Sequence, residues 1–238
     1  MMRVMANGRG GAQRIPRPEN VRIGNPAPWA DLSVDDLKFS LDEVRSILAR
    51  PRELVVPEHR ADARPAAVLI ALFEDASDGE ARVVLTKRPE TMPSHRGEIA
   101  FPGGKHDPVL DASLAATALR EAQEEVALDP REVEIVAELD GIGTIASQFV
   151  ITPFVGLLRA RPELVPHPRE VVSVFDVSLS ELLSVETHRS EIWPLTTTEL
   201  DIQFYDLVGE TVWGATARIL TNLFRVLTAQ RVEQRQSQ

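Results

Sequence analysis

The sequence predicts an α+β domain in which helices lie on both sides of a mixed β-sheet. Three observations lead to this class. A continuous apolar run from Ala66 to Phe73 has the length of a strand, and such runs are typical of strands that are buried on both faces. Apolar residues also recur at helical spacing before and after the strand-like segments. The order strand, strand, helix, strands, helix is typical of layered α+β domains.

Composition limits the range of functions. The 238 residues suffice for one large domain or two small ones, and 43% hydrophobic residues allow a sizeable core. A net charge of −10 argues against a nucleic-acid polymer as partner, but a small phosphorylated ligand held by a metal remains compatible. The absence of cysteine excludes disulfides, thiolate zinc sites and a cysteine nucleophile. No apolar run reaches the ~18 residues that span a bilayer, and the first residues lack a signal-peptide core, so we expect a soluble cytoplasmic protein without a membrane partner.

The region before the apolar run divides into two parts. Residues 1–29 mix Gly, Pro, Arg and Asn without apolar periodicity, and we expect a flexible, mildly basic arm. A nucleic-acid-binding tail is the alternative. Helical spacing over residues 31–50, with Ser33 or Ser40 as N-cap, predicts one or two short helices that pack on the domain from outside.

The elements of the sheet begin at the apolar run. A turn at 75–79 and a second apolar segment, 82–88, predict a β-hairpin. A short strand is expected at 97–101, and the Pro-Gly-Gly sequence at 102–104 is expected to turn into the loop before the next helix. That helix should end near 128–130, because proline provides a stop.

Further strands follow the helix. Alternating or continuous apolar segments predict strands at 133–139, 149–158, 170–177 and 202–207. Within the second of them, Pro153 suggests an edge position or a bulge. Short and amphipathic helices are expected at 178–183 and 211–227, the latter with Ile219, Leu220 and Leu223 as core residues. We therefore expect a single domain over residues 30–228, with its core from about 65 to 228, followed by a polar tail at 229–238.

The helix that follows the glycine turn concentrates negative charge. At ~100° per residue, Glu121, Glu124 and Glu125 span an arc of roughly 100°, while alanine, leucine and valine fill a neighbouring arc. Like charges one turn apart destabilise a helix, so a cation should lie there. Mg²⁺ or Mn²⁺ is the natural candidate, because hard cations prefer oxygen ligands and bridge carboxylates to substrate phosphates. An exposed charged face is the alternative, and the adjacent glycine turn makes it less favoured.

These residues resemble the signature of the Nudix hydrolase family: a glycine, a spacer, an acidic position, a second spacer and Arg-Glu-x-x-Glu-Glu-x-Gly. Gly104 and the run from Arg120 to Ala127 supply most of it. The resemblance implies an α/β/α sandwich with a catalytic loop and helix, in which water attacks a diphosphate with the help of Mg²⁺ or Mn²⁺. It also implies the following site residues: Glu121, Glu124, Glu125 and the Gly104 carbonyl as metal ligands, Glu124 or Glu125 as general base, and Arg120 to orient a glutamate.

A narrower resemblance extends to both sides of the signature. Four segments, Leu85–Arg88, His95–Gly104, Ala116–Glu125 and Trp213–Leu220, are similar to the coenzyme A diphosphatase branch of this family. The branch implies cleavage of coenzyme A or its thioesters into adenosine 3′,5′-bisphosphate and 4′-phosphopantetheine or its acyl form. Hydrolysis of ADP-ribose or another nucleoside diphosphate derivative is a second interpretation. A non-catalytic module of the same fold that senses a nucleotide is a third, although such a module would be expected to have lost metal-site glutamates.

Other charged residues near the signature are candidates for binding or activating the substrate. The nearest cationic side chains in this acidic protein are those of Lys87, Arg88, His95, Arg96 and Lys105. Two acids outside the signature, Glu98 and Glu170, are alternative candidates for the general base, or else ordinary glutamates at strand edges. The sequence does not determine the oligomeric state, and a homodimer is compatible with it.

The chain departs from the signature at two positions. Asp111, the acid of the loop, follows Gly104 after six residues rather than five, so its position in the loop is open. Ala127 stands where the family has glycine. If that position requires a positive φ, alanine there is strained by ~1 kcal/mol or somewhat more. The alternative is a helix that continues to Asp129 and Pro130.

Overall fold

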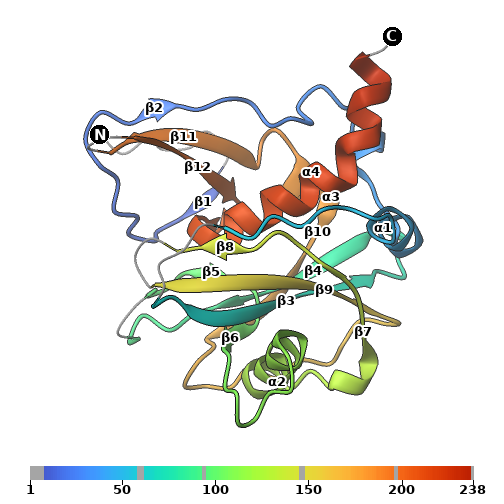
Figure 1. The fold of residues 1–238 in the computed structure, drawn as a ribbon. Coiled ribbons are helices and arrows are strands. Elements are labelled where there is room, and N and C mark those ends of the chain that lie inside the picture. Colours follow the sequence, from blue (N-terminus) through green and yellow to red (C-terminus); the bar gives the residue numbers. More distant parts are fainter. Residues whose placement is uncertain (1–7, 58–61, 93–94, 145–147, 196–197, 237–238) are drawn as a thin grey trace.

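The computed structural model describes residues 8–57, 62–92, 95–144, 148–195 and 198–236. In Figure 1 a large sheet crosses the molecule, with helix α2 against one face and the long helix α4 and a smaller sheet on the other side. This arrangement confirms the predicted α+β class with helices on both sides of a mixed sheet. No helix in the described ranges combines the length and the apolar character needed to cross a bilayer.

The large sheet has the strand order β10-β4-β3-β9-β7. β3 and β9 are parallel, and the other neighbours are antiparallel. Short strands β5, β6 and β8 pair with β4, β3 and β9, respectively. The strands have these bounds: β3 Arg64–Glu74, β4 Ala81–Lys87, β5 Ile99–Ala100, β6 Gly103–Lys105, β7 Val133–Glu138, β8 Ile142–Gly143, β9 Phe149–Leu158 and β10 Ser173–Ser178.

Strand β3 lies at the centre of this sheet and is buried on both faces, as its apolar sequence predicted. Ala67, Leu69 and Phe73 face the core beneath α2. Ile70 and Leu72 face the larger core on the α4 side. The predicted hairpin with β4 is also present, with Leu72 opposite Val83.

The helices begin largely where the sequence predicted. Ser40 caps α1 (Leu41–Leu48) in a capping box with Glu43, and Ser178 caps α3 (Leu179–Leu183). The other expected N-terminal helix is reduced to a 3₁₀ turn, η1 (Asp35–Leu37), and a second such turn, η2 (Pro130–Glu132), follows α2 (Leu114–Val126). Helix α4 (Gly214–Gln236) continues beyond residue 229, so helix extends into the predicted polar tail. Ile219, Leu220 and Leu223 are core residues, as predicted.

A second sheet, with the order β14-β12-β11-β2, was only partly predicted. Its strands are β2 Arg22–Ile23, β11 His188–Pro194, β12 Glu199–Asp206 and β14 Thr211–Val212. β12 begins before the expected strand at 202–207. β11 escaped prediction because its sequence, His-Arg-Ser-Glu-Ile-Trp-Pro, is mostly polar and ends in proline.

The segment expected to be a flexible arm packs against the domain from residue 8 onward. β1 (Gly10–Gly11) pairs with β13 (Val208–Gly209), and β2 pairs with β11. Trp29 is 1% exposed, and its indole nitrogen donates a hydrogen bond to the Leu183 carbonyl at 2.9 Å. The prediction of a free arm is therefore wrong for the part of it that the structure describes; residues 1–7 lie outside that part.

Three local predictions need correction. Pro153 lies in an interior strand, because β9 is flanked by β3 and by β7 with β8. The Pro153 carbonyl accepts a hydrogen bond from Leu139 N, between the end of β7 and the start of β8, so its missing N–H falls where the ladder is interrupted. Residues 103–105 form a strand rather than only a turn. Glu170 lies in a turn, because β10 begins at Ser173.

Candidate active site

The glycine pair of the signature lies against helix α2. β6 pairs with β3, which places Gly104 opposite Ala67. A Cβ atom on Gly103 would come within 2.4 Å of the Ala67 carbonyl oxygen, and one on Gly104 within 2.5 Å of the Glu121 carboxyl carbon. Both positions require glycine for this close approach. The backbone of the signature loop therefore contacts the glutamate face of the helix directly.

Helix α2 packs on the sheet through its small residues. Ser113 caps its first turn by accepting a hydrogen bond from Ala116 N, and Ala118, Ala122 and Val126 are buried. The helix ends at Val126. Ala127 has φ 57° and ψ 25°, in the left-handed region. The alternative of a helix that continues to Asp129 is therefore wrong, and the predicted positive φ at Ala127 is confirmed.

The three glutamates of α2 differ in burial. The side chain of Glu125 is 6% exposed and that of Glu121 15%, whereas that of Glu124 is 56% exposed. Glu125 Oε2 accepts a hydrogen bond from Gly103 N at 3.2 Å, and its Oε1 lies 4.0 Å from Arg88 Nη1. Burial raises the pKa of Glu125 to about 7 and also raises the pKa of Glu121.

Arg120 organises the polar groups around the glutamates. Its Nε and Nη2 donate to Asp111 at 2.7 and 3.0 Å, and it contacts Glu121 at 2.9 Å and Glu124 at 3.0 Å. Asp111 is buried in spite of the extra residue in its loop, and the Arg120 guanidinium holds the pKa of this carboxyl well below its ordinary value. This geometry is that of a residue that orients glutamates.

The carboxylates do not form a preassembled metal site. Within the described ranges, no group of three or more His, Asp or Glu side chains is arranged to hold a metal ion. Arg120 contacts the carboxylates of Glu121 and Glu124, while Glu125 is turned toward Gly103 N. A metal bound by all three glutamates would therefore replace Arg120 as partner of at least one of them.

Two predicted residues from outside the signature lie near the buried glutamates. Arg88 approaches Glu125, and Arg88 Nε is a buried donor without a hydrogen-bond partner in the described part of the chain. Glu170, in the exposed turn before β10, is close enough for its charge to raise the pKa of both Glu121 and Glu125.

In the described ranges, none of the remaining candidates contacts the three glutamates through its side chain, although the Lys105 carbonyl accepts a hydrogen bond from Arg120 at 3.3 Å. His95 Nδ1 is 2.9 Å from a Glu98 carboxylate oxygen, and Arg96 Nε donates to the Met92 carbonyl. Lys105 is exposed at the end of β6. Lys87 Nζ is 2.5 Å from Glu210, a residue that sequence reasoning did not single out. Because consecutive residues of a strand point to opposite faces, the Lys87 and Arg88 side chains separate.

Sequence reasoning also missed two residues that contact each other beside Asp111. His106 and Thr117 lie inside the spacers of the signature; Thr117 falls within the branch-like segment Ala116–Glu125, but the resemblance assigns it no role. The available signal was the isolated hydroxyl of Thr117 within the apolar sequence Leu-Ala-Ala-Thr-Ala-Leu. A helix-interior threonine with no solvent access needs a hydrogen-bond partner.

A groove of about 530 Å³ opens at the C-terminal end of α2, away from the glutamates, lined by residues of segments 127–132 and 158–163. Its charged side chains balance: Arg131, Arg159 and Arg161 face Asp129, Glu132 and Glu163. The groove therefore carries no net preference for an anionic substrate.

Comparison with known proteins shows the family of this chain. Residues 63–197 match the NUDIX domain model, and the chain belongs to this family. It is 41% identical over 165 residues to "Nudix hydrolase 22, chloroplastic" of Arabidopsis thaliana, covering 66% of this chain and 53% of the relative. It is 36% identical over 160 residues to the Nudix hydrolase NudL of Photorhabdus laumondii, covering 67% and 83%, respectively. The chain thus spans about half the length of the plant relative.

A solved structure of a MutT/nudix family protein from Enterococcus faecalis is also similar. It has a TM-score of 0.49 and 17% identity, and the match covers 75% of this chain and 66% of that chain. The family membership predicted from Gly104 and the Arg120–Ala127 run is therefore confirmed by the sequence match.

Proposed function

We propose that this chain is a Mg²⁺- or Mn²⁺-dependent hydrolase that cleaves the diphosphate of a nucleoside diphosphate derivative, with coenzyme A or its thioesters as the substrate. The observation that carries the proposal is the contact of the Gly103–Gly104 backbone with Glu121 and Glu125. Two largely buried carboxylates, whose burial raises their pKa values, meet a strand backbone there. A bound cation would relieve the cost of ionising them.

The donor set fits a hard divalent cation. Glu121, Glu124 and Glu125 offer carboxylate oxygens, and the backbone of Gly104, whose carbonyl oxygen is the fourth proposed ligand, lies against Glu121; Mg²⁺ and Mn²⁺ prefer such ligands. When bound, the metal would neutralise diphosphate oxygens and lower the pKa of a water molecule. Arg120 would hold the glutamates in orientation, and Arg88, with an unpaired buried Nε–H, would donate to an anionic substrate.

The general base is assigned among four glutamates. Glu170 is favoured over Glu98, because its charge reaches Glu121 and Glu125 from an exposed turn, whereas Glu98 is paired with His95. Glu124 and Glu125 stay candidates within the signature. The charge effect of Glu170 on both glutamates supports this choice, and within the described ranges its carboxylate has no ion pair with an arginine or lysine that would hold it away from a proton.

The choice of coenzyme A depends on the flank of the signature. The segment from His95 to Gly104 resembles the coenzyme A diphosphatase branch, and β5 within it pairs with β4, next to Arg88. Arg88 N also donates to the Glu98 carbonyl at 3.0 Å. The branch-specific segment therefore borders the residue that approaches Glu125, where a substrate diphosphate would lie. ADP-ribose or another nucleoside diphosphate derivative is the second candidate.

Product analysis with a substrate panel tests the proposal. The purified chain would be incubated with coenzyme A, an acyl-coenzyme A, ADP-ribose and a nucleoside diphosphate sugar, each with Mg²⁺, with Mn²⁺ or with a chelator. We expect metal-dependent release of adenosine 3′,5′-bisphosphate from coenzyme A. Cleavage of ADP-ribose alone would reject the coenzyme A assignment, and binding without cleavage of any substrate would favour the nucleotide-sensing module.

Substitution of Glu125 tests the catalytic site itself. Glu125→Gln removes the buried charge with little change in volume, and we expect turnover to fall by about 10³-fold while the fold persists, as for loss of a metal ligand or base. Glu132→Gln, in the exposed turn η2, is the control and should keep full turnover. Unchanged turnover in Glu125→Gln would remove the proposed role of this residue.

A further inference from the structure

A row of hydrogen bonds runs from the signature loop to the glutamates of α2. His106 Nδ1 lies 2.8 Å from Thr117 Oγ1, and Thr117 Oγ1 lies 2.9 Å from Asp111 Oδ2. Asp111 in turn accepts from Arg120, which contacts Glu121 and Glu124. The row therefore connects a loop histidine to two carboxylates of the proposed metal site.

The direction of each hydrogen bond follows from the atoms. Thr117 has one hydroxyl proton, and three atoms could accept it: His106 Nδ1 at 2.8 Å, Asp111 Oδ2 at 2.9 Å and the Ser113 carbonyl at 3.3 Å. The Asp111 carboxylate is ionised beside Arg120 and can only accept, whereas His106 Nδ1 can carry a proton of its own, so the Thr117 proton goes to Asp111. Thr117 Oγ1 then accepts from His106, which fixes the His106 tautomer with the proton on Nδ1.

Burial makes this hydroxyl hard to replace. Thr117 is fully buried, and the Asp111 side chain is 1% exposed. Asp111 Oδ2 accepts from three donors: Thr117, the Asp107 backbone N–H at 3.0 Å and Arg120 Nη2 at 3.0 Å. Without the Thr117 hydroxyl, the buried Asp111 carboxylate has no access to water that could restore the lost bond. It is then held by the Asp107 N–H and by Arg120, so its orientation and that of Arg120 are less restricted.

We propose that Thr117, with its hydroxyl directed by His106, is a positioning residue that sets the orientation of Glu121 and Glu124 through Asp111 and Arg120. The inference rests on the proposed function, since it assigns these glutamates to a metal site. It predicts that one hydroxyl group, three contacts away from the nearest proposed ligand along this row, changes the affinity for the metal.

The test compares Thr117→Val with two other variants. Valine keeps the volume of threonine and removes the hydroxyl, whereas Thr117→Ser keeps it. The matched control is Thr228→Val in α4, where a threonine that is 1% exposed donates only to the Phe224 carbonyl. Mn²⁺ dissociation constants would be measured by titration calorimetry and electron paramagnetic resonance, and kcat and KM on the best substrate of the panel.

We expect Thr117→Val to weaken Mn²⁺ binding by about 10-fold, the lower end for loss of an outer partner of a metal ligand. Thr117→Ser should restore most of the affinity, and Thr228→Val should bind as the unchanged chain does. His106→Ala should also weaken Mn²⁺ binding, as Thr117→Val does. Thr117→Val combined with Asp111→Asn should cost no more than Asp111→Asn alone, because both act through the same carboxylate.

A readout in the metal-free protein separates this inference from the proposed function. The NMR signal of the Arg120 Nε–H reports its hydrogen bond to Asp111, and we expect it to move and to exchange faster in Thr117→Val but not in Thr228→Val. An unchanged Mn²⁺ affinity and an unchanged Arg120 signal in Thr117→Val would overturn the inference. Absence of Mn²⁺ binding by the unchanged chain would instead overturn the proposed function, and the Arg120 signal would then decide the positioning role.

Discussion

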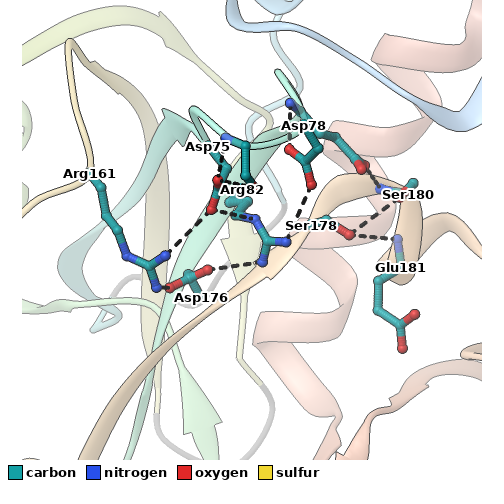
Figure 2. Close-up of polar contacts among 10 residues, drawn as sticks. Asp75, Asp78, Arg82, Arg161, Asp176, Ser178, Ser180 and Glu181 are labelled. Carbon is teal, nitrogen blue, oxygen red and sulfur yellow. Dashed lines mark hydrogen bonds and ion pairs between the residues drawn. The ribbon is translucent and has the colours of Figure 1, made fainter.

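Two clusters of arginine and carboxylate side chains differ in how their charges balance. At the hairpin of β3 and β4, Arg82 contacts Asp75 at 3.4 Å, Asp78 at 3.7 Å and Asp176 at 3.1 Å. Arg161 contacts Asp75 and Asp176 from the other side (Figure 2). The two guanidinium groups thus share three carboxylates, and they connect the hairpin to β10.

The cluster on α2 has two guanidinium groups for four carboxylates, because Arg88 approaches Glu125 only at 4.0 Å and Arg120 serves the other three. Arg120 contacts Asp111, Glu121 and Glu124, while Glu125 is buried close by. The pKa of Asp111 is lowered, whereas burial raises the pKa values of Glu121 and Glu125. At the hairpin, by contrast, hydrogen bonds from Ser77 lower the pKa of Asp75. At the hairpin, the arginines and carboxylates therefore pair with one another and connect the strands. The α2 cluster instead has excess negative charge, which a cation would neutralise.

The largest expected effect on stability comes from neutralising the Glu125 side chain in the α2 cluster. Burial raises the folded-state pKa of Glu125 from 4.5 to about 7, so between these pH values the folded protein holds a proton that the unfolded chain has released. Stability must therefore fall as pH rises through this window. Glu125→Gln removes the free-energy cost of ionising the buried carboxyl. We expect it to stabilise the metal-free protein by about 3 kcal/mol at pH 8 and by almost nothing at pH 4.5.

Urea unfolding of the metal-free chain at the two pH values measures this difference. Asp176→Asn, in the hairpin cluster, is the control, because its charge is matched by Arg82 and Arg161. It should destabilise the protein at pH 8. If Glu125→Gln destabilised the protein at pH 8 as Asp176→Asn does, the two clusters would not differ in charge balance.

A smaller effect is expected from Arg82→Met, which removes one guanidinium from the hairpin cluster. Asp78 and Asp176 lose their contacts with Arg82, although Arg161 still contacts Asp75 and Asp176. Because Arg82 is partly exposed and one guanidinium remains, we expect a loss of about 2 kcal/mol, less than for a fully buried pair. Thermal unfolding measures the loss. Turnover should stay unchanged below the melting temperature, and a parallel loss of metal affinity would contradict the separation of the two clusters.

The sequence predicted those parts of the molecule whose signal is local. The apolar run of β3, the serine caps of α1 and α3, and the glycine turn with its glutamate helix each follow from neighbouring residues. β11 could not be predicted, because its sequence is mostly polar and ends in proline, and its hairpin with β12 and its pairing with the distant β2 leave no apolar pattern. The contact of Lys87 with Glu210 could not be predicted either, since it joins residues far apart in the sequence.

The sequence indicates which residues belong to the candidate site better than it indicates how their side chains are arranged. Glu121 and Glu125 are close to the glycine backbone, as the signature implies, but no feature of the sequence indicates that Arg120 contacts Glu121, Glu124 and Asp111 at once. That arrangement depends on the loop from 105 to 113, whose extra residue shifts Asp111 in sequence while the Asp107 backbone and Thr117 hold its carboxylate. Hydrogen bonding therefore compensates for the altered spacing.

The smallest expected effect concerns the end of α2, between the two clusters. Ala127 adopts φ 57° and ψ 25°, and the groove that it lines also contains Arg161 of the hairpin cluster. Alanine is strained in this left-handed conformation, so Ala127→Gly relieves ~1 to 2 kcal/mol in the folded state. Glycine also makes the unfolded chain more flexible, which offsets part of the gain. We expect a net stabilisation of about 0.5 to 1 kcal/mol, seen as a rise in melting temperature of roughly 2 to 4 °C, without a change in metal affinity.

Ala112→Gly, in the exposed loop before α2, is the control and should give no such rise. A fall in the melting temperature of Ala127→Gly would mean that α2 does not end in a left-handed residue, and the register of the glutamates against Gly103 and Gly104 would have to be redrawn.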